Sequence, residues 1–236
     1  MKSVVLSLGG SMIVPDKVDT KFLKNFRKLI LDFTKKGNKA AMVCGGGRTC
    51  RIYQGAAKDL VGKKITDVDL DWVGIKSTRL NAELVRIMFG KDAHRVVIDN
   101  PEDPIKTNKK IIIGAGYSPG HSSDMDAVLL AHNIKANVMM NLTNVDYVYD
   151  KDPRKFKDAK PLKKLTWNKF LDIIGRRWVP GKNTPFDPIA AKKCMKFKMK
   201  VIIINGNDLG NIKNYLEGKK FKGTILGWFF SITRDQ

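Results

Sequence analysis

Short apolar runs alternate along the chain with segments in which apolar residues recur every three or four positions. The first pattern is typical of buried strands and the second of amphipathic helices. Strands are predicted at Val4–Leu8, Lys39–Cys44, Arg95–Ile98, Lys110–Ile113, Asn137–Leu142, Val201–Ile204 and Gly223–Leu226. Helices are predicted at Asp19–Thr34, Thr49–Leu60, Asp69–Met88, Ser123–Asn133, Trp167–Ile174, Pro188–Lys198 and Leu209–Leu216. A polar loop is predicted from Thr143 to Lys160.

Three of the predicted helices carry apolar residues at helical spacing, and those of the third helix are predicted to point inward. The stripes are Phe22, Leu23, Phe26, Leu29, Ile30 and Phe33 in the first helix, Ile52, Tyr53, Ala56, Ala57 and Leu60 in the second, and Val73, Leu80, Leu84 and Ile87 in the third. The helix at Pro188 has a separate start signal, because Asp187 is a favourable N-cap and proline is favourable in the first turn. An apolar tail at Trp228–Phe230 suits either packing or a subunit contact.

Strands that alternate with helices favour a mostly parallel α/β sheet that is covered by helices on both faces. The chain has 236 residues, and neither an internal repeat nor a low-complexity linker divides it. That length suits one large α/β domain. We therefore expect residues 1–236 to form a single domain.

The charge balance is strongly basic, since 44 Lys and Arg residues against 23 Asp and Glu residues give a formal net charge of +21. Such an excess attracts polyanions and leaves open a nucleic-acid-binding protein. The lysines are dispersed along the chain, however, and no aromatic-rich RNA-binding signature interleaves them. A solvated basic surface that suits anionic metabolites is the favoured interpretation, and nucleic acid is not an expected partner.

Other classes of protein are disfavoured. No apolar stretch reaches the roughly 20 residues that span a bilayer, and no secretory signal pattern precedes the first strand. We therefore expect a cytoplasmic protein without a membrane partner. The three cysteines, Cys44, Cys50 and Cys194, match no zinc spacing, and the three histidines are scattered. No metal site built from protein side chains is expected.

Glycine-rich turns follow three of the predicted strands, at Gly9–Ser11, Gly45–Gly47 and Gly114–Asp124. Without a Cβ atom, the backbone can approach a phosphate closely, and the first amides of a following helix point at it. In an open α/β sheet, ligands bind outside the carboxyl ends of the strands. The three turns are therefore predicted to converge on one crevice that holds two or three phosphate groups.

Five segments in order resemble the amino acid kinase superfamily: Leu8–Ser11, Gly45–Gly47 with Arg51, Ser118–Asp124, Thr143–Pro153 and Phe186–Lys192. Within this superfamily the chain looks most like the archaeal UMP kinases. The resemblance extends from Val4 to Leu226, and Thr143–Pro153 is its most specific part. It implies a three-layer α/β/α sandwich, transfer of the γ-phosphoryl group of ATP to UMP with Mg²⁺, and a homo-oligomer, by family resemblance a hexamer.

The resemblance also implies a role for individual residues. The ATP side would be lined by Gly10, Ser11, Gly47, Arg51, Thr143, Asn144, Tyr149 and Asp152. The UMP side would be lined by Gly46, Asp71, Tyr117, Ser118, Pro119, Gly120, His121, Ser122 and Ser123. Catalytic roles would fall to Arg51, Asp124 and Asp187.

These roles suit phosphoryl transfer, which needs two phosphates held in line with their charge neutralised. Glycine amides and serine hydroxyls supply preorganised donors, and Arg51 can form a forked contact with a phosphate. Each charged residue also has a structural alternative. Arg51 would be a surface helix residue, Asp124 and Asp187 would be helix N-caps, and Asp71 would complement a helix dipole.

Three positions depart from the superfamily pattern. Ser7 and Asp187 stand where many members have lysine, so the cation that stabilises the transferring phosphoryl group is left among Arg51, Mg²⁺ and Lys192. Tyr147 stands where glycine is more usual, and it would be strained if the position requires a positive φ. Two other functions stay open: a superfamily kinase for isopentenyl phosphate or carbamate, and a non-catalytic nucleic-acid-binding protein.

Overall fold

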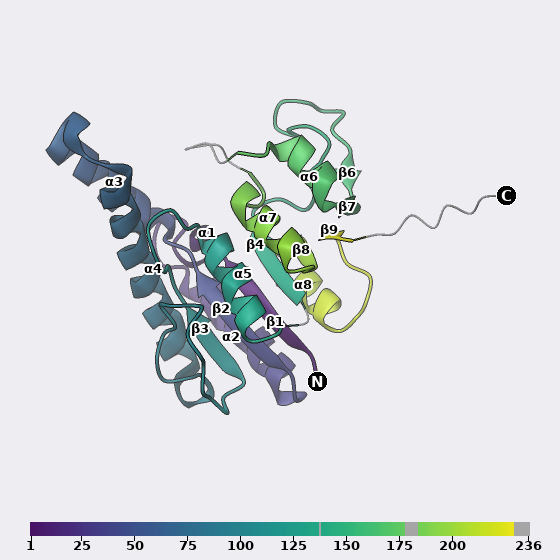
Figure 1. Cartoon of the computed structure of the whole chain (residues 1–236). Helices are drawn as coiled ribbons and strands as arrows, with labels where there is room; N and C mark the ends of the chain where they lie inside the picture. Colours follow the sequence, from purple (N-terminus) through teal and green to yellow (C-terminus); the bar gives the residue numbers. More distant parts are fainter. Residues whose placement is uncertain (137, 178–183, 229–236) are drawn as a thin grey trace.

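A seven-stranded sheet with the strand order β3-β2-β1-β4-β8-β9-β7 forms the centre of the computed structural model, which describes residues 1–136, 138–177 and 184–228 (Figure 1). Its strands are β1 (Ser3–Leu8), β2 (Lys39–Cys44), β3 (Ile111–Gly114), β4 (Val138–Thr143), β7 (Lys164–Thr166), β8 (Val201–Asn205) and β9 (Thr224–Gly227). The α-helices are α1 (Gly10–Ile13), α2 (Thr20–Lys35), α3 (Gly47–Val61), α4 (Asp67–Phe89), α5 (Ser123–Asn133), α6 (Trp167–Ile174), α7 (Pro188–Lys196) and α8 (Leu209–Leu216). A separate antiparallel pair joins β5 (Val148–Tyr149) to β6 (Pro161–Leu162).

The register of the sheet places the carboxyl ends of five strands along one edge. Leu8 at the end of β1 lies between Cys44 of β2 and Leu142 of β4. Farther out, β2 pairs in parallel with β3, and Thr143 at the end of β4 lies beside Asn205 of β8. Only the pair of β8 and β9 is antiparallel within this sheet. The prediction of a mostly parallel α/β sheet is confirmed.

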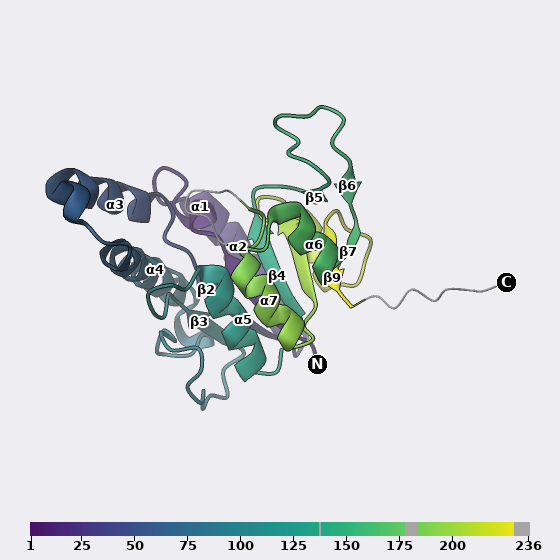
Figure 2. The same cartoon turned by 45° about the horizontal axis from the view of Figure 1, so that its top comes forward.

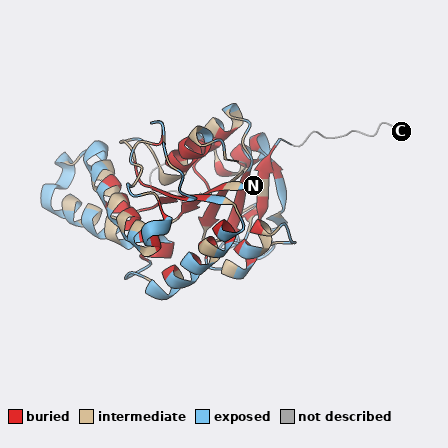
Figure 3. Cartoon of the chain, turned by 90° about the horizontal axis from the view of Figure 1, so that it is seen from below, coloured by how far each residue is buried: buried red, intermediate tan, exposed pale blue. Residues whose placement is uncertain are grey.

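Alternate residues of each strand supply two separate hydrophobic layers, because successive side chains point to opposite faces of a sheet. One face packs against α1, α2, α4 and α8, and it buries Leu6, Met42 and Ile113. The other packs against α5, α6 and α7, and it buries Val5 and Val43. Figure 3 shows the buried residues concentrated in the sheet and on the inner sides of the helices. The expected three-layer α/β/α arrangement is thus present.

The strand predicted at Arg95–Ile98 is wrong. The chain meets β3 only at two isolated bridges, one from Ala93 to Ile111 and one from Ile98 to Gly114. Between them Arg95 is exposed and Val96 is 60% exposed. Because Arg95 and Val96 are exposed to solvent, they do not pair with β3. The segment therefore contacts the edge of the sheet only at Ala93 and Ile98.

The apolar stripe predicted for the helix at Asp19–Thr34 is confirmed, since Leu23, Phe26, Ile30 and Phe33 are buried in α2. The stripe of α3 is not inward, because α3 contains no buried residue. In α4 the predicted inward residues Leu80, Leu84 and Ile87 are exposed. The inward face of α4 instead combines apolar residues with small polar ones, namely Ile75, Ser77, Thr78, Asn81, Ala82, Val85 and Phe89.

Figures 1 and 2 show the reason for the error in α3 and α4: the helices run side by side, and α3 extends away from the sheet. The apolar periodicity therefore identifies the helices correctly, but their apolar sides face outward. At the other end of the sequence, Trp228 is 52% exposed, and the rest of the predicted apolar tail lies outside the described residues. None of the helices within the described ranges is long and apolar enough to cross a membrane.

Candidate functional site

The glycine turns that follow β1 and β2 pack directly against each other. The amide of Gly45 donates to the carbonyl of Leu8 at 3.0 Å. A Cβ atom on Gly10 would overlap the backbone of Gly47, and Gly47 has a φ of +63° that L side chains rarely adopt. Neither α1 nor α3 has a side-chain hydrogen bond at its N-cap. Two helix N-termini without side-chain caps therefore lie together at one edge of the sheet, an arrangement that suits an anion. The amide of Arg48 in α3 is already bound, since it donates to the carbonyl of Val14 at 2.9 Å.

The turns after β4 and β8 join the same region. The amide of Gly206 donates to the carbonyl of Thr143 at 2.8 Å, and a Cβ atom on Gly206 would lie 2.8 Å from the sulfur of Met12 in α1. Asn205 donates from Nδ2 to Oδ1 of Asp146 at 2.8 Å. Sequence reasoning missed Asn205 and Gly206, although polar and glycine residues directly after a buried parallel strand were a sufficient signal.

A group of carboxylates and hydroxyls closes the site beside β1. Oδ1 of Asp124 accepts from the Ser7 hydroxyl at 2.9 Å, and Oδ2 accepts from the amide of Asp187 at 3.1 Å. The carboxylate of Asp187 accepts from the Ser122 hydroxyl and from the amide of Ile189. Burial raises the pKa of Asp124 from 3.8 to about 6, and the two hydrogen bonds act in the opposite direction.

Of the two carboxylates that the sequence offered as helix N-caps, only Asp187 has that role. Asp187 is the N-cap of α7, and Ser122, not Asp124, caps α5. Asp124 instead lies in the first turn of α5 and reaches back to the end of β1. Its two partners come from β1 and from the residue before α7, so Asp124 links three elements at the edge of the sheet.

The segment after β3 is held from the side of α4. The amide of Gly120 donates to the Asp71 carboxylate at 2.7 Å, and the amide of Gly116 donates to the Thr78 hydroxyl at 2.7 Å. Asp71 therefore does not only complement the dipole of its own helix. It also binds the loop that, together with Asp71, is predicted to hold a ligand.

Asn81 fixes the triglycine turn from behind. Its Nδ2 donates to the carbonyl of Gly45 at 2.8 Å and to that of Gly46 at 3.1 Å. Asn81 is buried, and it is another residue that sequence reasoning missed. The available signal was the helical spacing of small polar residues at Ser77, Thr78 and Asn81, which places them on one side of the helix.

Arg51 lies on the exposed side of the second turn of α3. Arg51 and Asp71 both lie near the Cys50 thiol. Burial is the main cause that raises the pKa of this thiol, the charge of Arg51 lowers it, and the charge of Asp71 raises it. Cys50 in turn lies against Gly46, where a Cβ atom would meet the Cys50 side chain. Arg51 is thus placed beside the triglycine turn, without a hydrogen bond to it.

The residues predicted between Thr143 and Pro153 are less close together. Tyr149 lies in β5 near Asp146, the residue that accepts from Asn205, and burial together with Asp146 and Tyr147 raises the pKa of Tyr149. The carboxylate of Asp152 is bound to the amide of Arg154 at 3.0 Å and to its guanidinium at 3.1 Å. Asp152 therefore caps a turn through Arg154. Tyr147 is not among the non-glycine residues with a positive φ, so the predicted strain is absent.

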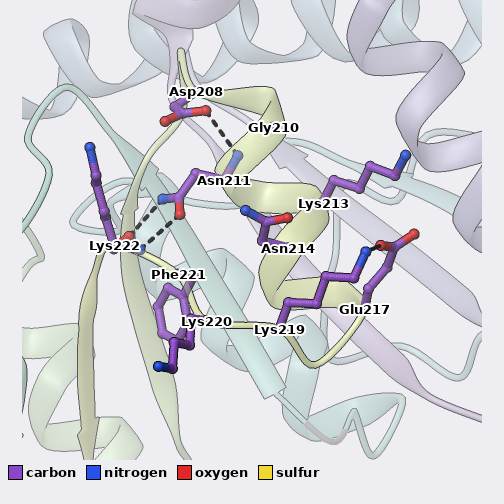
Figure 4. Close-up of a pocket in the computed structure, with 10 residues that line it drawn as sticks. All are labelled: Asp208, Gly210, Asn211, Lys213, Asn214, Glu217, Lys219, Lys220, Phe221 and Lys222. Carbon is purple, nitrogen blue, oxygen red and sulfur yellow. Dashed lines mark hydrogen bonds and ion pairs between the residues drawn. The ribbon is translucent and has the colours of Figure 1, made fainter.

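Two further features bear on what the site can bind. Among the described residues, no group of three or more His, Cys, Asp and Glu side chains is placed to hold a metal ion. A hollow of about 600 Å³ lies between α8 and residues 219–222, and no residue of the glycine turns at 9–11, 45–47 or 114–124 lines it. Figure 4 shows that Lys213, Lys220 and Lys222 around this hollow point in different directions. Their ammonium groups do not converge, so the hollow is not a competing anion site.

Comparison with known proteins places these features in a family. The model of the amino acid kinase family matches residues 2–205. The chain is 34% identical to a uridylate kinase from Thermoplasma volcanium over 221 residues, 92% of this chain and 94% of the relative. It is 35% identical to a uridylate kinase from Sulfolobus acidocaldarius over 215 residues, 89% of this chain and 93% of the relative.

Solved structures agree. The crystal structure of uridylate kinase from Archaeoglobus fulgidus superimposes with a TM-score of 0.82 at 32% identity and covers 96% of this chain and 100% of that one. The structure of UMP kinase from Bacillus anthracis, at 21% identity and a TM-score of 0.79, shows the same fold over 96% of each chain. The sheet order, the paired glycine turns and the matched length lead to one conclusion: this chain belongs to the amino acid kinase family.

Proposed function

We propose that this protein is an ATP-dependent kinase that transfers the γ-phosphoryl group of ATP to UMP and forms ADP and UDP. The observation that carries the proposal is the direct packing of the Gly10 turn against the Gly47 turn. This packing brings two uncapped helix starts together at the edge where the Asp124 carboxylate is also held. The uridylate kinases to which the chain is similar over most of its length support the same reaction.

The ATP side is proposed to comprise Gly10, Ser11, Gly47, Arg51, Thr143, Asn144, Tyr149 and Asp152. The hydrogen bond from Gly206 to Thr143 and the contact of Gly206 with Met12 support this side, because they join the turn after β4 to α1. Asn205 and Gly206 extend the proposed side beyond the residues that the sequence indicated. Asp152 is the least supported member, since Arg154 already occupies its carboxylate.

The UMP side is proposed to comprise Gly46, Asp71 and residues 117–123. The 2.7 Å hydrogen bond from Gly120 to Asp71 supports it, because it joins the segment after β3 to the helix that also positions the triglycine turn through Asn81. Ser122 is the N-cap of α5 and Ser123 is its first residue, so amides of this helix start can donate to an acceptor phosphate. The Ser122 hydroxyl itself already donates to Asp187.

Phosphoryl transfer asks the protein to align two phosphates and to neutralise the charge that moves between them. Arg51 is proposed to supply a forked positive charge. Asp124 and Asp187 are proposed to order the donors around the transferred group, because their carboxylates connect Ser7, Ser122 and the start of α7. The Ser7 hydroxyl is neutral and donates to Asp124. Position 7 therefore does not supply the positive charge of the lysine that many superfamily members have there.

Mg²⁺ is proposed to enter with ATP. This ion is commonly held by substrate phosphates and retained water, with few protein ligands. The site fits that mode, because the described part of the chain offers no dedicated cluster of metal-ligating side chains, whereas it offers amides and hydroxyls for the phosphates. When bound, the ion would neutralise part of the phosphate charge.

The protein is also proposed to self-associate, with a hexamer as the form that the family resemblance implies. The supporting observation is an outward apolar face on α3 and α4, which includes Ile52 at 54%, Tyr53 at 64%, Leu60 at 86% and Leu80 at 64% exposure. Exposed apolar residues on two neighbouring helices favour a protein contact. A single domain that spans residues 1–236 and a cytoplasmic location remain predictions.

An acceptor screen tests the proposed reaction. ADP formation is measured with ATP and Mg²⁺ in the presence of UMP, CMP, dUMP, isopentenyl phosphate or carbamate. We expect the fastest release with UMP. Equal or faster release with isopentenyl phosphate or carbamate would overturn the UMP assignment in favour of another acceptor. No ADP release with any acceptor, together with RNA binding that weakens steeply with salt, would favour a non-catalytic nucleic-acid-binding protein.

A further inference from the structure

Asp126 is a buried carboxylate that the proposed reaction does not use. It is 1% exposed and lies two residues after Asp124 on α5. Residues two apart on an α-helix are about 200° apart around its axis, so their side chains point to nearly opposite sides. Asp124 faces Ser7 at the end of β1, whereas Asp126 faces the segment that precedes the helix.

Both oxygens of Asp126 bind this segment. Oδ2 accepts from the amide of Tyr117 at 3.2 Å, and Oδ1 lies 3.1 Å from Nδ1 of His121. Burial raises the pKa of Asp126, and the neighbouring His121 and Arg79 act in the opposite direction. A buried carboxylate is retained at this cost only where its oxygens are satisfied, and here residues of one loop satisfy them.

The opposite side of the same loop is held by α4. Arg79 donates to the carbonyls of Gly116 at 3.3 Å and of Tyr117 at 3.4 Å, and it forms an ion pair with Asp99 at 3.1 Å. With the bonds from Gly116 to Thr78 and from Gly120 to Asp71, the loop is fixed at Gly116, Tyr117 and Gly120 without help from His121. The contact of Asp126 with His121 is therefore not needed to hold the backbone.

What that contact determines is the state of the imidazole ring. A carboxylate that accepts from Nδ1 requires the proton to be on Nδ1, so Nε2 is the ring nitrogen left for another group. The side chain of His121 is 29% exposed while Asp126 is 1% exposed, so the accessible part of the ring is the edge away from Asp126. The Tyr117 ring packs edge-on at 5.7 Å and limits rotation of the imidazole.

We propose that Asp126 is a positioning residue of the acceptor site, which orients His121 through Nδ1 so that Nε2 contacts the acceptor nucleotide. This inference rests on the proposed function, because residues 117–123 are the proposed acceptor side. Asp126 acts through His121 and does not touch the nucleotide. The pair adds a specific polar contact to a loop whose other donors are mainly backbone amides.

Two kinds of measurement test the pairing. The first is ¹H–¹⁵N NMR of the histidine ring nitrogens in the ligand-free protein, where the three histidines are assigned with the His121→Ala variant. We expect a protonated Nδ1 on His121 in the wild type and its loss or exchange broadening in Asp126→Asn. A proton on Nε2 alone in the wild type, or a spectrum unchanged by Asp126→Asn, would refute the pairing whatever the acceptor is.

The second measurement is steady-state kinetics with the acceptor that the screen identifies. Asp126→Asn and His121→Ala should each raise the acceptor KM about tenfold, as for one lost hydrogen bond, with kcat changed less than about twofold. The double variant should be no worse than His121→Ala alone, because Asp126 acts through His121. Additive losses, or a fall in kcat without a change in KM, would contradict the proposal.

Controls separate this role from a structural one. Asp32→Asn removes an exposed carboxylate on α2 and should leave both measurements unchanged. If Asp126→Asn does not fold, His121→Ala still decides the kinetic question, since an unchanged acceptor KM in that variant would exclude contact with the nucleotide. Failure of the wild type to phosphorylate UMP would overturn the UMP assignment only, and the ring-nitrogen spectra would still decide the pairing of Asp126 with His121.

Discussion

The hydroxyl of Ser7 donates a 2.9 Å hydrogen bond to Oδ1 of Asp124, and this bond joins the carboxyl end of β1 to the first turn of α5. Ser7 is 2% exposed and lies near the carboxyl end of the apolar strand β1. A buried carboxylate whose nearest partner is a neutral hydroxyl is destabilised as an anion by loss of water. This relationship leads to a prediction in which stability and activity change in opposite directions.

Asp124→Asn should reduce turnover at least 100-fold but should make the protein more stable above pH 6. Burial raises the pKa of Asp124 from 3.8 to about 6. Between these two values the folded protein binds more protons than the unfolded chain, so the stability of the wild type falls as the pH rises. Below pH 4 the carboxyl is neutral in both states and the difference vanishes.

The size of this effect follows from the shift, which corresponds to about 3 kcal/mol at pH 7 to 8. Urea unfolding of the wild type and of Asp124→Asn at pH 4, 6 and 8 measures it. The stability difference should grow through the window from pH 4 to pH 6 and then level off. If the stability difference between variant and wild type is the same at all three pH values, Asp124 is not held as a destabilised anion.

Gly10→Ala should unfold or strongly destabilise the protein, by about 3 kcal/mol, because the added Cβ atom would overlap the backbone of Gly47. Backbone atoms cannot rotate away as a flexible side chain can, so the two turns would have to separate. Thermal unfolding and ADP formation measure the result.

The matched control for Gly10 is Gly55→Ala in α3, where an added Cβ atom meets nothing within 4 Å. That change should raise stability by about 1 kcal/mol, since alanine favours a helix more than glycine does. Equal tolerance of alanine at both positions would mean that the turns after β1 and β2 do not pack as described.

Arg51→Ala should lower turnover about 100-fold and leave thermal unfolding unchanged. Arg51 is exposed and contributes little packing, but the loss of one preorganised charge at a transferring phosphoryl group is costly. Lys58→Ala removes an exposed charge farther along the same helix and serves as the control. Normal turnover of the Arg51 variant would remove this residue from the site and leave Lys192 as the candidate.

Leu60→Glu should shift the protein to a smaller species in light scattering coupled to gel filtration. Leu60 is 86% exposed on the outward face of α3, where a second subunit would bury it. A charge in such an apolar contact costs several kcal/mol of association energy. Lys220→Glu introduces the same residue at the exposed loop after α8 and should not change the mass. Identical masses for both variants would place any subunit contact elsewhere.

Much of the candidate site could be predicted because it follows directly from strand ends. In a parallel sheet, the residues after each buried run share an edge, so the Gly9–Ser11 and Gly45–Gly47 turns had to lie near each other once the strands were correct. The N-cap role of Asp187 was equally local. By contrast, Asn81 and Asn205 bind residues that are far away in the sequence, and these partners are visible only after folding.

The sequence by itself determined the alternation of strands and helices, the α2 core face and the glycine turns, because each depends on periodicity or backbone freedom within a few residues. The tertiary structure decided which side of α3 and α4 faces the sheet, since a 3.6-residue periodicity identifies an apolar stripe but not what covers it. It also decided that Arg95–Ile98 leaves the sheet and that Asp124 binds Ser7. Those outcomes depend on which strands become neighbours, and local pattern carries no information about that choice.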